Sequence, residues 1–479
     1  MKILQDTALT YDDVLLVPQY SDVDSRRKLS IQTRLTNQIT LQIPIVSANM
    51  DVVTESEMAI AMAREGGIGI IHRFLSIEEQ SRQIQRVKKA ESFIVENPIM
   101  MNTAHTVGDL KKIVDETGTG GILILNGDEK LVGIVTTRDL LFESNDNKPL
   151  TEIMQKKVVT GPAQISLKDA EKLLHENRIE KLPLVDEKGR VAGLVTLKDI
   201  MKITQYPKAT KDSRGRLMVG AAVGVRDKEM HRVDAALQAD ADCIVVDIAH
   251  GDSNLEIEMI KNIRKNFPSA QIIGGNVATG DGTKRLIDAG VDAVKIGVGP
   301  GSICITRMVA GSGVPQLTAV IECAEAARDA GIPIIADGGI RQPGDVAKAI
   351  AAGAQTVMIG SMLAGTDESP GMVMTRKGHR YKASRGMASR EANIARNRKE
   401  GNDLTQEEIE EYVAEGVEAA VPYRGKAREV LTQLVGGLQS GMSYSGAHDL
   451  DDFQKKAIFV RMTGAGLRES GPHDVEVLG

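Results

Sequence analysis

Short apolar runs rich in β-branched residues recur along the chain, each ending in Gly, Asp, Asn or Ser and each followed by a stretch with helical spacing. This alternation predicts repeated β-α units, which build a parallel sheet. The runs are apolar at nearly every position, as expected for strands covered on both faces. Eight such units match an α/β fold, the (β/α)8 or TIM barrel. The expected strands lie in residues 43–50, 67–72, 217–224, 243–251, 271–278, 293–301, 333–340 and 356–362.

The count of eight holds only if residues 94–205 are an insertion between the second and third units. This segment repeats itself, because residues 129–140 align with residues 189–200. A twofold repeat of strand, strand and helix predicts a separate domain, which leaves residues 1–93 and 206–479 for the barrel. A Thr-x-x-Asp motif occurs in both copies and could simply cap a helix in each. The aligned motif residues are Thr136 and Asp139, then Thr196 and Asp199.

A polar, charged stretch without β character spans residues 388–414 and follows the eighth expected strand. Because active sites of such barrels lie at the C-terminal ends of the strands, we expect this stretch to cover that mouth as a mobile flap. The alternative for part of it is a solvated surface helix at residues 405–412.

Composition narrows the class of protein. The chain has 479 residues, 42% of them hydrophobic and 26% charged, which is typical of globular proteins. Its 59 basic and 65 acidic residues give a net charge of −6 without long runs of one sign, so nothing favours nucleic-acid binding. We find no signal peptide and no apolar window long enough to cross a membrane, and three dispersed cysteines do not suit a disulfide framework. A cytoplasmic protein is expected.

The loop after the sixth expected strand carries a cysteine behind several glycines. Gly297, Gly299 and Gly301 would let the backbone turn tightly before Cys304. A thiol at the catalytic mouth of a barrel could act as a nucleophile, whereas a lone cysteine elsewhere is more often a small core residue.

The loops after the seventh and eighth expected strands predict a phosphorylated ligand. Gly339, Gly360 and Ser361 stand where many barrels bind phosphate through backbone amides. Asp337 could accept hydrogen bonds from both hydroxyls of a ribose, although a turn-capping Asp is the plainer alternative. The Gly-x-Gly patterns do not fit a Rossmann fingerprint, because no acidic residue closes a βαβ unit as that fold requires.

Several long motifs together resemble the IMP dehydrogenase and GMP reductase family over nearly the whole chain. They are LTYDDVLLVPQYS (9–21), GVGPGSICITR (297–307), ADGGIR (336–341), GTDESPG (365–371), QLVGGLQSGMSYSGA (433–447) and FVRMTGAGLRES (459–470). The resemblance implies a (β/α)8 barrel in which Cys304 adds to C2 of a purine to give a covalent intermediate. It also implies that the insertion is a tandem CBS (Bateman) domain that binds regulatory purine nucleotides.

The same resemblance implies roles for individual residues. The phosphate of a purine mononucleotide would contact Ser302, Gly339, Gly360 and Ser361, and its ribose Asp337. The purine would lie near Met387 and Glu415. Nicotinamide-riboside contacts match Asp247, Asn276, Gly297 and Gly299. A monovalent cation, expected to be K+, would bind Gly299, Gly301 and Cys304 together with Glu469, Ser470 and Gly471 of a neighbouring subunit. A site shared between subunits implies a homotetramer, with an octamer as the alternative.

The flap separates the two activities of this family. Dehydrogenases carry an Arg-Tyr pair there, in which the Arg acts as the base that activates water, and no Arg-Tyr occurs between residues 388 and 414. Further departures from the dehydrogenase pattern occur at Asn49, Phe74, Ser384 and Ala388. Chain length, the insertion and the cation motif are more common among dehydrogenases.

We therefore predict an NADPH-dependent GMP reductase that forms IMP, ammonia and NADP+ through Cys304. Thr306 and Glu415 could supply the proton for departing ammonia, although both residues also occur in dehydrogenases. The alternative is an IMP dehydrogenase that converts IMP to XMP with NAD+ and water. A second alternative is a nucleotide-sensing regulator without catalysis, against which the retained Cys304, Thr306, Asp337 and Glu415 argue.

Overall fold

The chain forms two compact units. The computed structural model describes residues 3, 6–91, 93–399 and 404–472. One unit comprises residues 1–88, 208–210 and 217–479, and the other comprises residues 89–207 and 211–216. Within the described ranges, no helix has the length and apolar character needed to cross a membrane.

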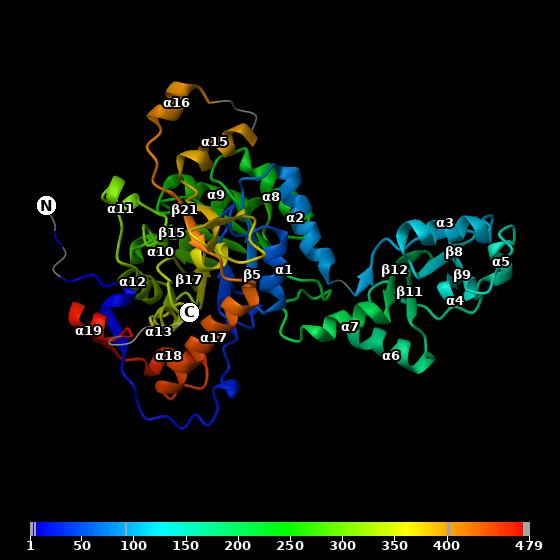
Figure 1. The fold of residues 1–479 in the computed structure, drawn as a ribbon, viewed down its shortest axis with the longest axis horizontal. Coiled ribbons are helices and arrows are strands. Elements are labelled where there is room, and N and C mark those ends of the chain that lie inside the picture. The colour runs from blue at the N-terminus through cyan, green and yellow to red at the C-terminus, as the bar shows by residue number, and fades with distance from the viewer. Residues whose placement is uncertain (1–2, 4–5, 92, 400–403, 473–479) are drawn as a thin grey trace. The chain divides into compact units, whose positions relative to one another are not determined.

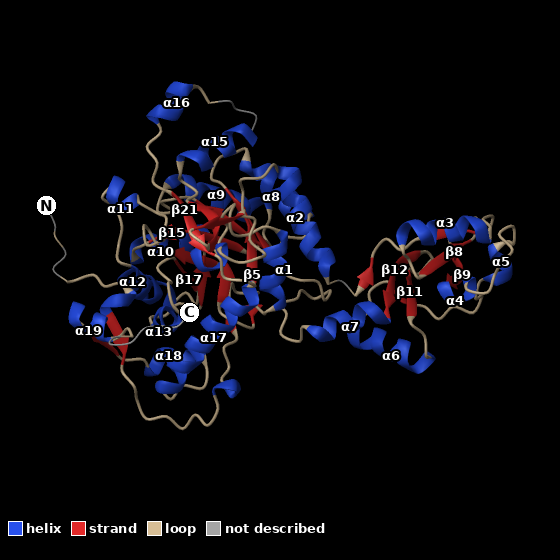
Figure 2. Ribbon diagram, in the orientation of Figure 1, coloured by secondary structure: helices blue, strands red, loops and turns tan. Residues whose placement is uncertain are grey.

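A closed barrel of eight parallel strands forms the centre of the first unit (Figure 2). Every expected strand is present, so the predicted (β/α)8 fold is confirmed. The strands, in barrel order, are β13 (Val219–Val223), β14 (Cys243–Asp247), β15 (Ile272–Val277), β16 (Ala293–Ile296), β17 (Ile334–Asp337), β18 (Thr356–Ile359), β4 (Ile45–Ser47) and β5 (Ile68–Ile71). Their side chains are almost wholly buried, as the continuous apolar runs indicate.

Helices cover the outer face of the barrel (Figure 1). Local sequence sets their ends: α10 begins where Thr279 accepts a hydrogen bond from Gly282 N and stops at Gly290, which has a left-handed φ of 101°. The covering helices are α1 (Ser56–Arg64), α2 (Ile77–Ala90), α8 (Glu229–Gln238), α9 (Asn254–Asn266), α10 (Gly280–Ala289), α12 (Gln316–Arg328), α13 (Pro343–Ala351) and α17 (Ala427–Tyr444). Ile, Val, Leu and Ala fill the interface, which suits a chain with 6 Phe and no Trp.

Additional elements extend the first unit beyond the barrel. Strand β1 (Val14–Leu16) pairs with β22 (Phe459–Arg461), and β2 (Thr33–Arg34) pairs with β3 (Thr40–Leu41). A three-stranded sheet of β19 (Val373–Arg376), β20 (His379–Arg385) and β21 (Glu418–Pro422) follows the barrel. Short helices complete the unit: η1 (Tyr11–Asp13), η2 (Arg26–Lys28), α11 (Thr306–Val309), α14 (Ser361–Ala364), α18 (Leu450–Lys456) and α19 (Gly464–Glu469).

The stretch expected to form the flap connects β20 to β21. It contains α15 (Arg390–Lys399) and α16 (Gln406–Glu411), both drawn above the barrel in Figure 1. Thr405 caps α16 in a capping box with Glu408, so the helix expected at residues 405–412 is present. That this stretch moves as a flap stays a prediction.

The second unit shows the internal repeat in three dimensions. Each copy has an antiparallel strand pair followed by a helix, and each pair has a register shift at the same place, at Ile124/Leu125 and at Leu184/Val185. The two sheets are β7-β8-β9 and β10-β11-β12-β6. Their elements are β6 (Ile94–Val95), β7 (Met100–Asn102), α3 (Val107–Thr117), β8 (Gly121–Leu125), β9 (Leu131–Thr136), α4 (Thr137–Leu140), α5 (Leu150–Ile153), β10 (Gly161–Pro162), α6 (Leu167–Asn177), β11 (Lys181–Val185), β12 (Val191–Thr196) and α7 (Leu197–Gln205).

The Thr-x-x-Asp motifs of the repeat do cap the helices that follow them. In the first copy Thr136 N donates to Asp139 Oδ2 at 2.7 Å, and in the second copy Asp199 N donates to Thr196 Oγ1 at 3.2 Å. The capping explanation therefore accounts for both motifs by itself. The assignment of this unit to the tandem CBS class stays a prediction.

Candidate active site

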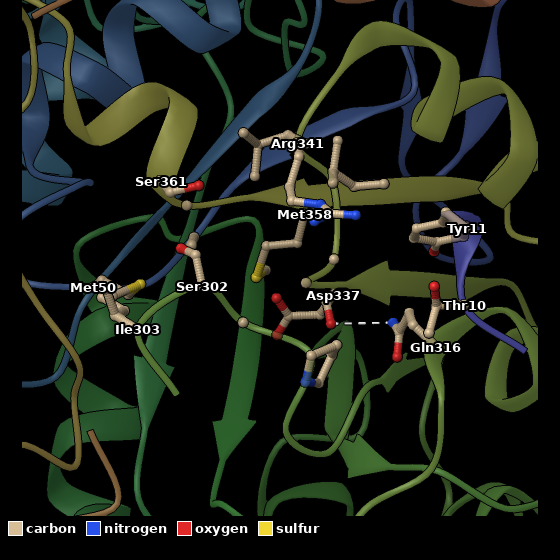
Figure 3. Close-up of a pocket in the computed structure, with 18 of the residues that line it drawn as sticks. Thr10, Tyr11, Met50, Ser302, Ile303, Gln316, Asp337, Arg341, Met358 and Ser361 are labelled. Carbon is tan, nitrogen blue, oxygen red and sulfur yellow. Dashed lines mark hydrogen bonds between the residues drawn. The ribbon is translucent and has the colours of Figure 1, made fainter. Parts of the chain in front are cut away.

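A cavity of about 420 Å³ opens at the C-terminal ends of the barrel strands (Figure 3). Loops after β4, β16, β17 and β18 line it together with residues 10–12. Its volume is that of a small-ligand site. All five residues expected to bind the phosphate and ribose lie in its wall, namely Ser302, Asp337, Gly339, Gly360 and Ser361.

The loop after β16 has the tight turns expected of its glycines. Gly297 has a φ of 144°, and a Cβ there would lie 2.2 Å from the carbonyl oxygen of Asp337, so only glycine fits. Arg307 lies over Gly299 and donates to the carbonyl oxygens of Val298 at 3.3 Å and Val314 at 2.5 Å. These bonds hold the loop closed on itself, a role for Arg307 that sequence reasoning missed.

Cys304, Thr306 and Glu415 come together directly after Ser302 and Ile303 of the cavity wall, although none of the three lines the cavity itself. Cys304 Sγ lies 3.2 Å from Thr306 Oγ1, which donates to Glu415 Oε2 at 2.7 Å. The backbone fixes this arrangement, because Ile305 N donates to Glu415 O at 2.8 Å. A thiol, a hydroxyl and a carboxylate in series can pass a proton between the sulfur and the carboxylate.

The other two cysteines have no such surroundings. Burial raises the pKa of Cys323 to about 12 and raises the pKa of Cys243 further. Both are buried structural residues, whereas Cys304 is free and partly exposed. The structure therefore favours Cys304 as the candidate nucleophile.

The flap is anchored beside the cysteine loop. Val417 N donates to Ile303 O at 3.1 Å, and a Cβ on Gly386 would lie 3.0 Å from Gly416 Cα. Met387 follows Gly386 in this turn and is half-buried beside the cavity rather than in its lining. Glu415 reaches the site from the other end of the same stretch. Both residues expected near the purine thus stand at the base of the flap.

The residues expected to contact nicotinamide lie next to the ribose aspartate. Asp247 ends β14, Asn276 lies in β15, and Lys295 of β16 contacts both of them and Asp337. Lys295 Nζ is 3.3 Å from Asp247 Oδ1 and 3.0 Å from Asp337 Oδ2. Burial lowers the pKa of Lys295, but the carboxylates of Asp337 and Asp247 outweigh this and hold it above its ordinary value. Sequence reasoning missed Lys295, although a lysine within an apolar strand was the available signal.

Residues 8–473 match the IMP dehydrogenase / GMP reductase domain. The chain belongs to this family. It is 53% identical over 468 residues to an inosine-5'-monophosphate dehydrogenase of Nitrosopumilus maritimus, covering 98% of each chain. It is 48% identical over 480 residues to a GMP reductase of Leishmania donovani, covering 98% of this chain and 97% of that protein. A cysteine-to-alanine variant of Trypanosoma brucei GMP reductase, solved with guanosine 5'-monophosphate, has a TM-score of 0.87 at 47% identity and 98% coverage of both chains.

Membership of the IMP dehydrogenase/GMP reductase family confirms the predicted resemblance and identifies the chain as an oxidoreductase that uses an NAD(P) cofactor. Full-length relatives carry both names, so the comparisons leave the two activities open. The roles predicted for individual residues remain predictions.

The expected cation site of this family is divided between two parts of the chain. Gly299, Gly301 and Cys304 share one loop, in which Cys304 N donates to Gly301 O at 3.1 Å. Glu469 ends α19, and the Ser470 hydroxyl donates to Gly466 O at 2.8 Å within that helix region. Gly471 follows directly. Among the described residues, no group of three or more His, Cys, Asp or Glu could hold a metal ion, so a cation here would rely on carbonyl oxygens.

A second cavity, of about 400 Å³, lies in the repeat unit. Residues from both copies line it, including Asp139 of the first and Asn177 of the second. Four basic side chains and two acidic ones surround it, which favours an anionic ligand. They are Arg138, Lys157, Arg178 and Lys181, with Asp139 and Glu180.

Proposed function

We propose that this protein is a GMP reductase. The reaction converts GMP, NADPH and a proton into IMP, NADP+ and ammonia. GMP would occupy the 420 Å³ cavity, with its phosphate on Ser302, Gly339, Gly360 and Ser361 and its ribose on Asp337. The purine would then extend toward the base of the flap, where Cys304 and Glu415 meet. The guanosine 5'-monophosphate bound to the related T. brucei reductase supports this substrate.

The first half of the reaction uses the hydrogen-bonded series at Cys304. Its sulfur forms a bond to C2 of the purine while the thiol proton passes through Thr306 to Glu415, over separations of 3.2 and 2.7 Å. Glu415 then gives a proton to the 2-amino group, and the C2–N bond breaks to release ammonia. The product is a purine joined to Cys304.

The second half is reduction of that covalent purine. NADPH, when bound, would supply the hydride for C2, and Cys304 would then leave C2 as a thiolate when the C–S bond breaks to give IMP. Asp247, Asn276, Gly297 and Gly299 would hold the nicotinamide riboside, because their polar atoms lie at the strand ends next to Asp337. A K+ ion on the carbonyl oxygens of the cysteine loop would stabilise its turns.

We choose the reductase over the dehydrogenase because residues 388–414, the flap, contain no Arg-Tyr pair. Hydrolysis of the covalent purine would need a base that activates water. Residues 388–414 hold one tyrosine, Tyr412, which follows Glu411, and its hydroxyl donates to Ala388 O at 3.3 Å. That bond keeps the tyrosine at the base of the flap. The side chain of Arg396 lies outside the described residues, and Arg390 and Arg398 are exposed.

An IMP dehydrogenase is the second candidate. The observation in its favour is the 53% identity to the N. maritimus dehydrogenase over the full chain. In that case another group would have to activate the water, and NAD+ would replace NADPH.

Two parallel assays test the proposal with purified protein. The absorbance of reduced nicotinamide is followed with GMP and NADPH in one assay, and with IMP, NAD+ and K+ in the other. A decrease in the first alone supports the reductase. An increase in the second alone identifies a dehydrogenase and overturns the proposal.

We also propose that the repeat unit binds a regulatory purine nucleotide in its 400 Å³ cavity. The basic side chains around the cavity suit phosphates, and the T. brucei reductase has been solved with guanosine 5'-triphosphate. We further propose a homotetramer, since the cation site needs residues of a neighbour. Nucleotide response that survives deletion of residues 94–205 would contradict the regulatory role, and light scattering of the intact protein measures the assembly.

A further inference from the structure

We propose that Lys295 is a positioning residue. Its ammonium group holds Asp337, the proposed ribose-binding residue, next to Asp247 and Asn276, which are expected to contact the dinucleotide. The inference rests on the proposed function, because it takes Asp337 as the group that binds the ribose of the mononucleotide. Lys295 itself would touch neither ligand. It would act through Asp337, Asp247 and Asn276, which it holds in place.

The contacts of Lys295 use all three protons of its ammonium group. The side chain is 2% exposed and lies within the barrel. Nζ contacts Asp337 Oδ2 at 3.0 Å, Asp247 Oδ1 at 3.3 Å and the side-chain oxygen of Asn276. A lysine has three donors, so none remains for a ligand. A buried ammonium is tolerated where carboxylates and hydrogen bonds compensate it, as they do here.

These contacts determine how the neighbouring polar groups face the cavity. With its oxygen on Lys295, Asn276 presents Nδ2 to Asp337 Oδ2 at 3.0 Å and to Gly297 O at 2.8 Å. Asp337 Oδ2 thus accepts from both Lys295 and Asn276. In the part of the chain that the structure describes, the side-chain hydrogen bonds of Asp337 involve this oxygen alone, which leaves Oδ1 for a ribose hydroxyl.

The backbone beneath the cluster is built to bring Lys295 close. Gly275 pairs with Lys295 across β15 and β16. A Cβ on Gly275 would lie 2.5 Å from the Lys295 carbonyl oxygen and 2.8 Å from its Cβ. Gly275 N in turn donates to the buried Glu256 Oε1 at 2.7 Å. A larger residue at position 275 would therefore push the two strands apart and displace Lys295 from its partners.

The test compares two ligands on the full-length protein, without dinucleotide, by titration calorimetry. GMP has both ribose hydroxyls, and 2',3'-dideoxy-GMP has neither. We expect the wild type to prefer GMP by about tenfold to a hundredfold, since Asp337 Oδ1 is a charged acceptor for one ribose hydroxyl. Lys295→Met should reduce that preference to about threefold or less while leaving dideoxy-GMP binding unchanged. A merely structural effect would weaken both ligands alike.

Lys88→Met is the matched control. Lys88 is also buried and pairs with Asp242 Oδ2 at 2.6 Å, but Asp242 precedes β14 and therefore lies at the opposite end of the barrel. This variant should lose stability and keep the ligand preference. If Lys295→Met does not fold, Asn276→Ala replaces it, because that change breaks the bonds to Lys295 and Asp337 and should also reduce the preference.

Asp337→Asn distinguishes failure of the inference from failure of the proposed site. If Asp337→Asn keeps the full wild-type preference for GMP over dideoxy-GMP, the ribose binds elsewhere and the proposed ribose site at Asp337 is overturned. The positioning role alone would be overturned if Asp337→Asn loses the preference for GMP over dideoxy-GMP while Lys295→Met keeps it in full. The same holds for Asn276→Ala where that variant is used.

Discussion

Replacement of Thr306 by valine removes the hydroxyl between the nucleophile and the carboxylate. Valine has a similar shape, and the backbone bond from Ile305 N to Glu415 O is untouched, so Glu415 should stay in place. The change removes a hydrogen bond of 2.7 Å to a carboxylate and a 3.2 Å contact with the thiol. The thiol proton then has no path to Glu415.

The size of the effect follows from those contacts. A hydrogen bond to a charged group contributes about 1.5–3 kcal/mol, or roughly 10- to 150-fold in rate if it is needed only in the transition state. Loss of positioned proton transfer costs about 10²- to 10⁴-fold. We expect kcat for GMP reduction to fall within that second range. KM for GMP should change by less than about threefold, because Thr306 does not line the cavity.

Steady-state kinetics of NADPH oxidation measures both constants. Thr283→Val is the control, since it removes a buried hydroxyl that donates to Thr279 O at 3.0 Å in α10, away from the site. It should lower the free energy of unfolding by about 1 kcal/mol and leave kcat unchanged. If Thr306→Val keeps kcat near the wild-type value, the proton path through Thr306 is refuted.

Three further variants test other parts of the account. Cys304→Ala should abolish turnover yet bind GMP calorimetrically, and measurable turnover would exclude it as the nucleophile. Burial raises the pKa of Glu256 well above its ordinary value of 4.5. The folded protein therefore keeps a proton that the unfolded chain has already released, and the free energy of unfolding falls as the pH rises from the unfolded pKa to the folded pKa. Glu256→Gln should therefore raise the melting temperature more at pH 8 than at pH 4, and an equal change at both pH values would contradict this. Asp139→Ala should lower the free energy of unfolding by about 0.5–2 kcal/mol in urea titrations, because it removes the carboxylate that accepts from Thr136 N and Thr136 Oγ1 in the capping box, and an unchanged free energy of unfolding would contradict that role.

The barrel could be predicted because its strands are local and uniformly apolar. Each of the eight expected runs contains a strand, and the positions after them carry the glycines and polar residues of the cavity. The internal repeat was equally visible, since both copies keep the same motif and the same register shift. These features depend on a few consecutive residues.

The sheet beside the flap could not be predicted in the same way. In β20 the inward-facing residues include Lys382 and Ser384, so the strand lacks alternating apolar positions. Lys382 Nζ instead donates to the carbonyl oxygens of Thr366 and Ser369 at 2.7 and 2.6 Å. A polar interior satisfied by backbone oxygens has no hydrophobic signal.

Lys295 shows why part of the site was also missed. Its strand looks like an ordinary apolar run, and the partners of its ammonium group come from three other strands. Only the closed barrel brings those strand ends together. The series from Cys304 to Glu415 likewise joins residues far apart in the chain, and it was proposed from the family resemblance rather than from spacing.

Product stoichiometry with GMP and NADPH tests the central claim most directly. Ammonia, IMP and NADP+ are quantified together in one reaction of the purified protein. The account predicts that the three appear in equal amounts and that none forms with Cys304→Ala. Formation of XMP and NADH from IMP and NAD+, without ammonia release from GMP, would contradict it.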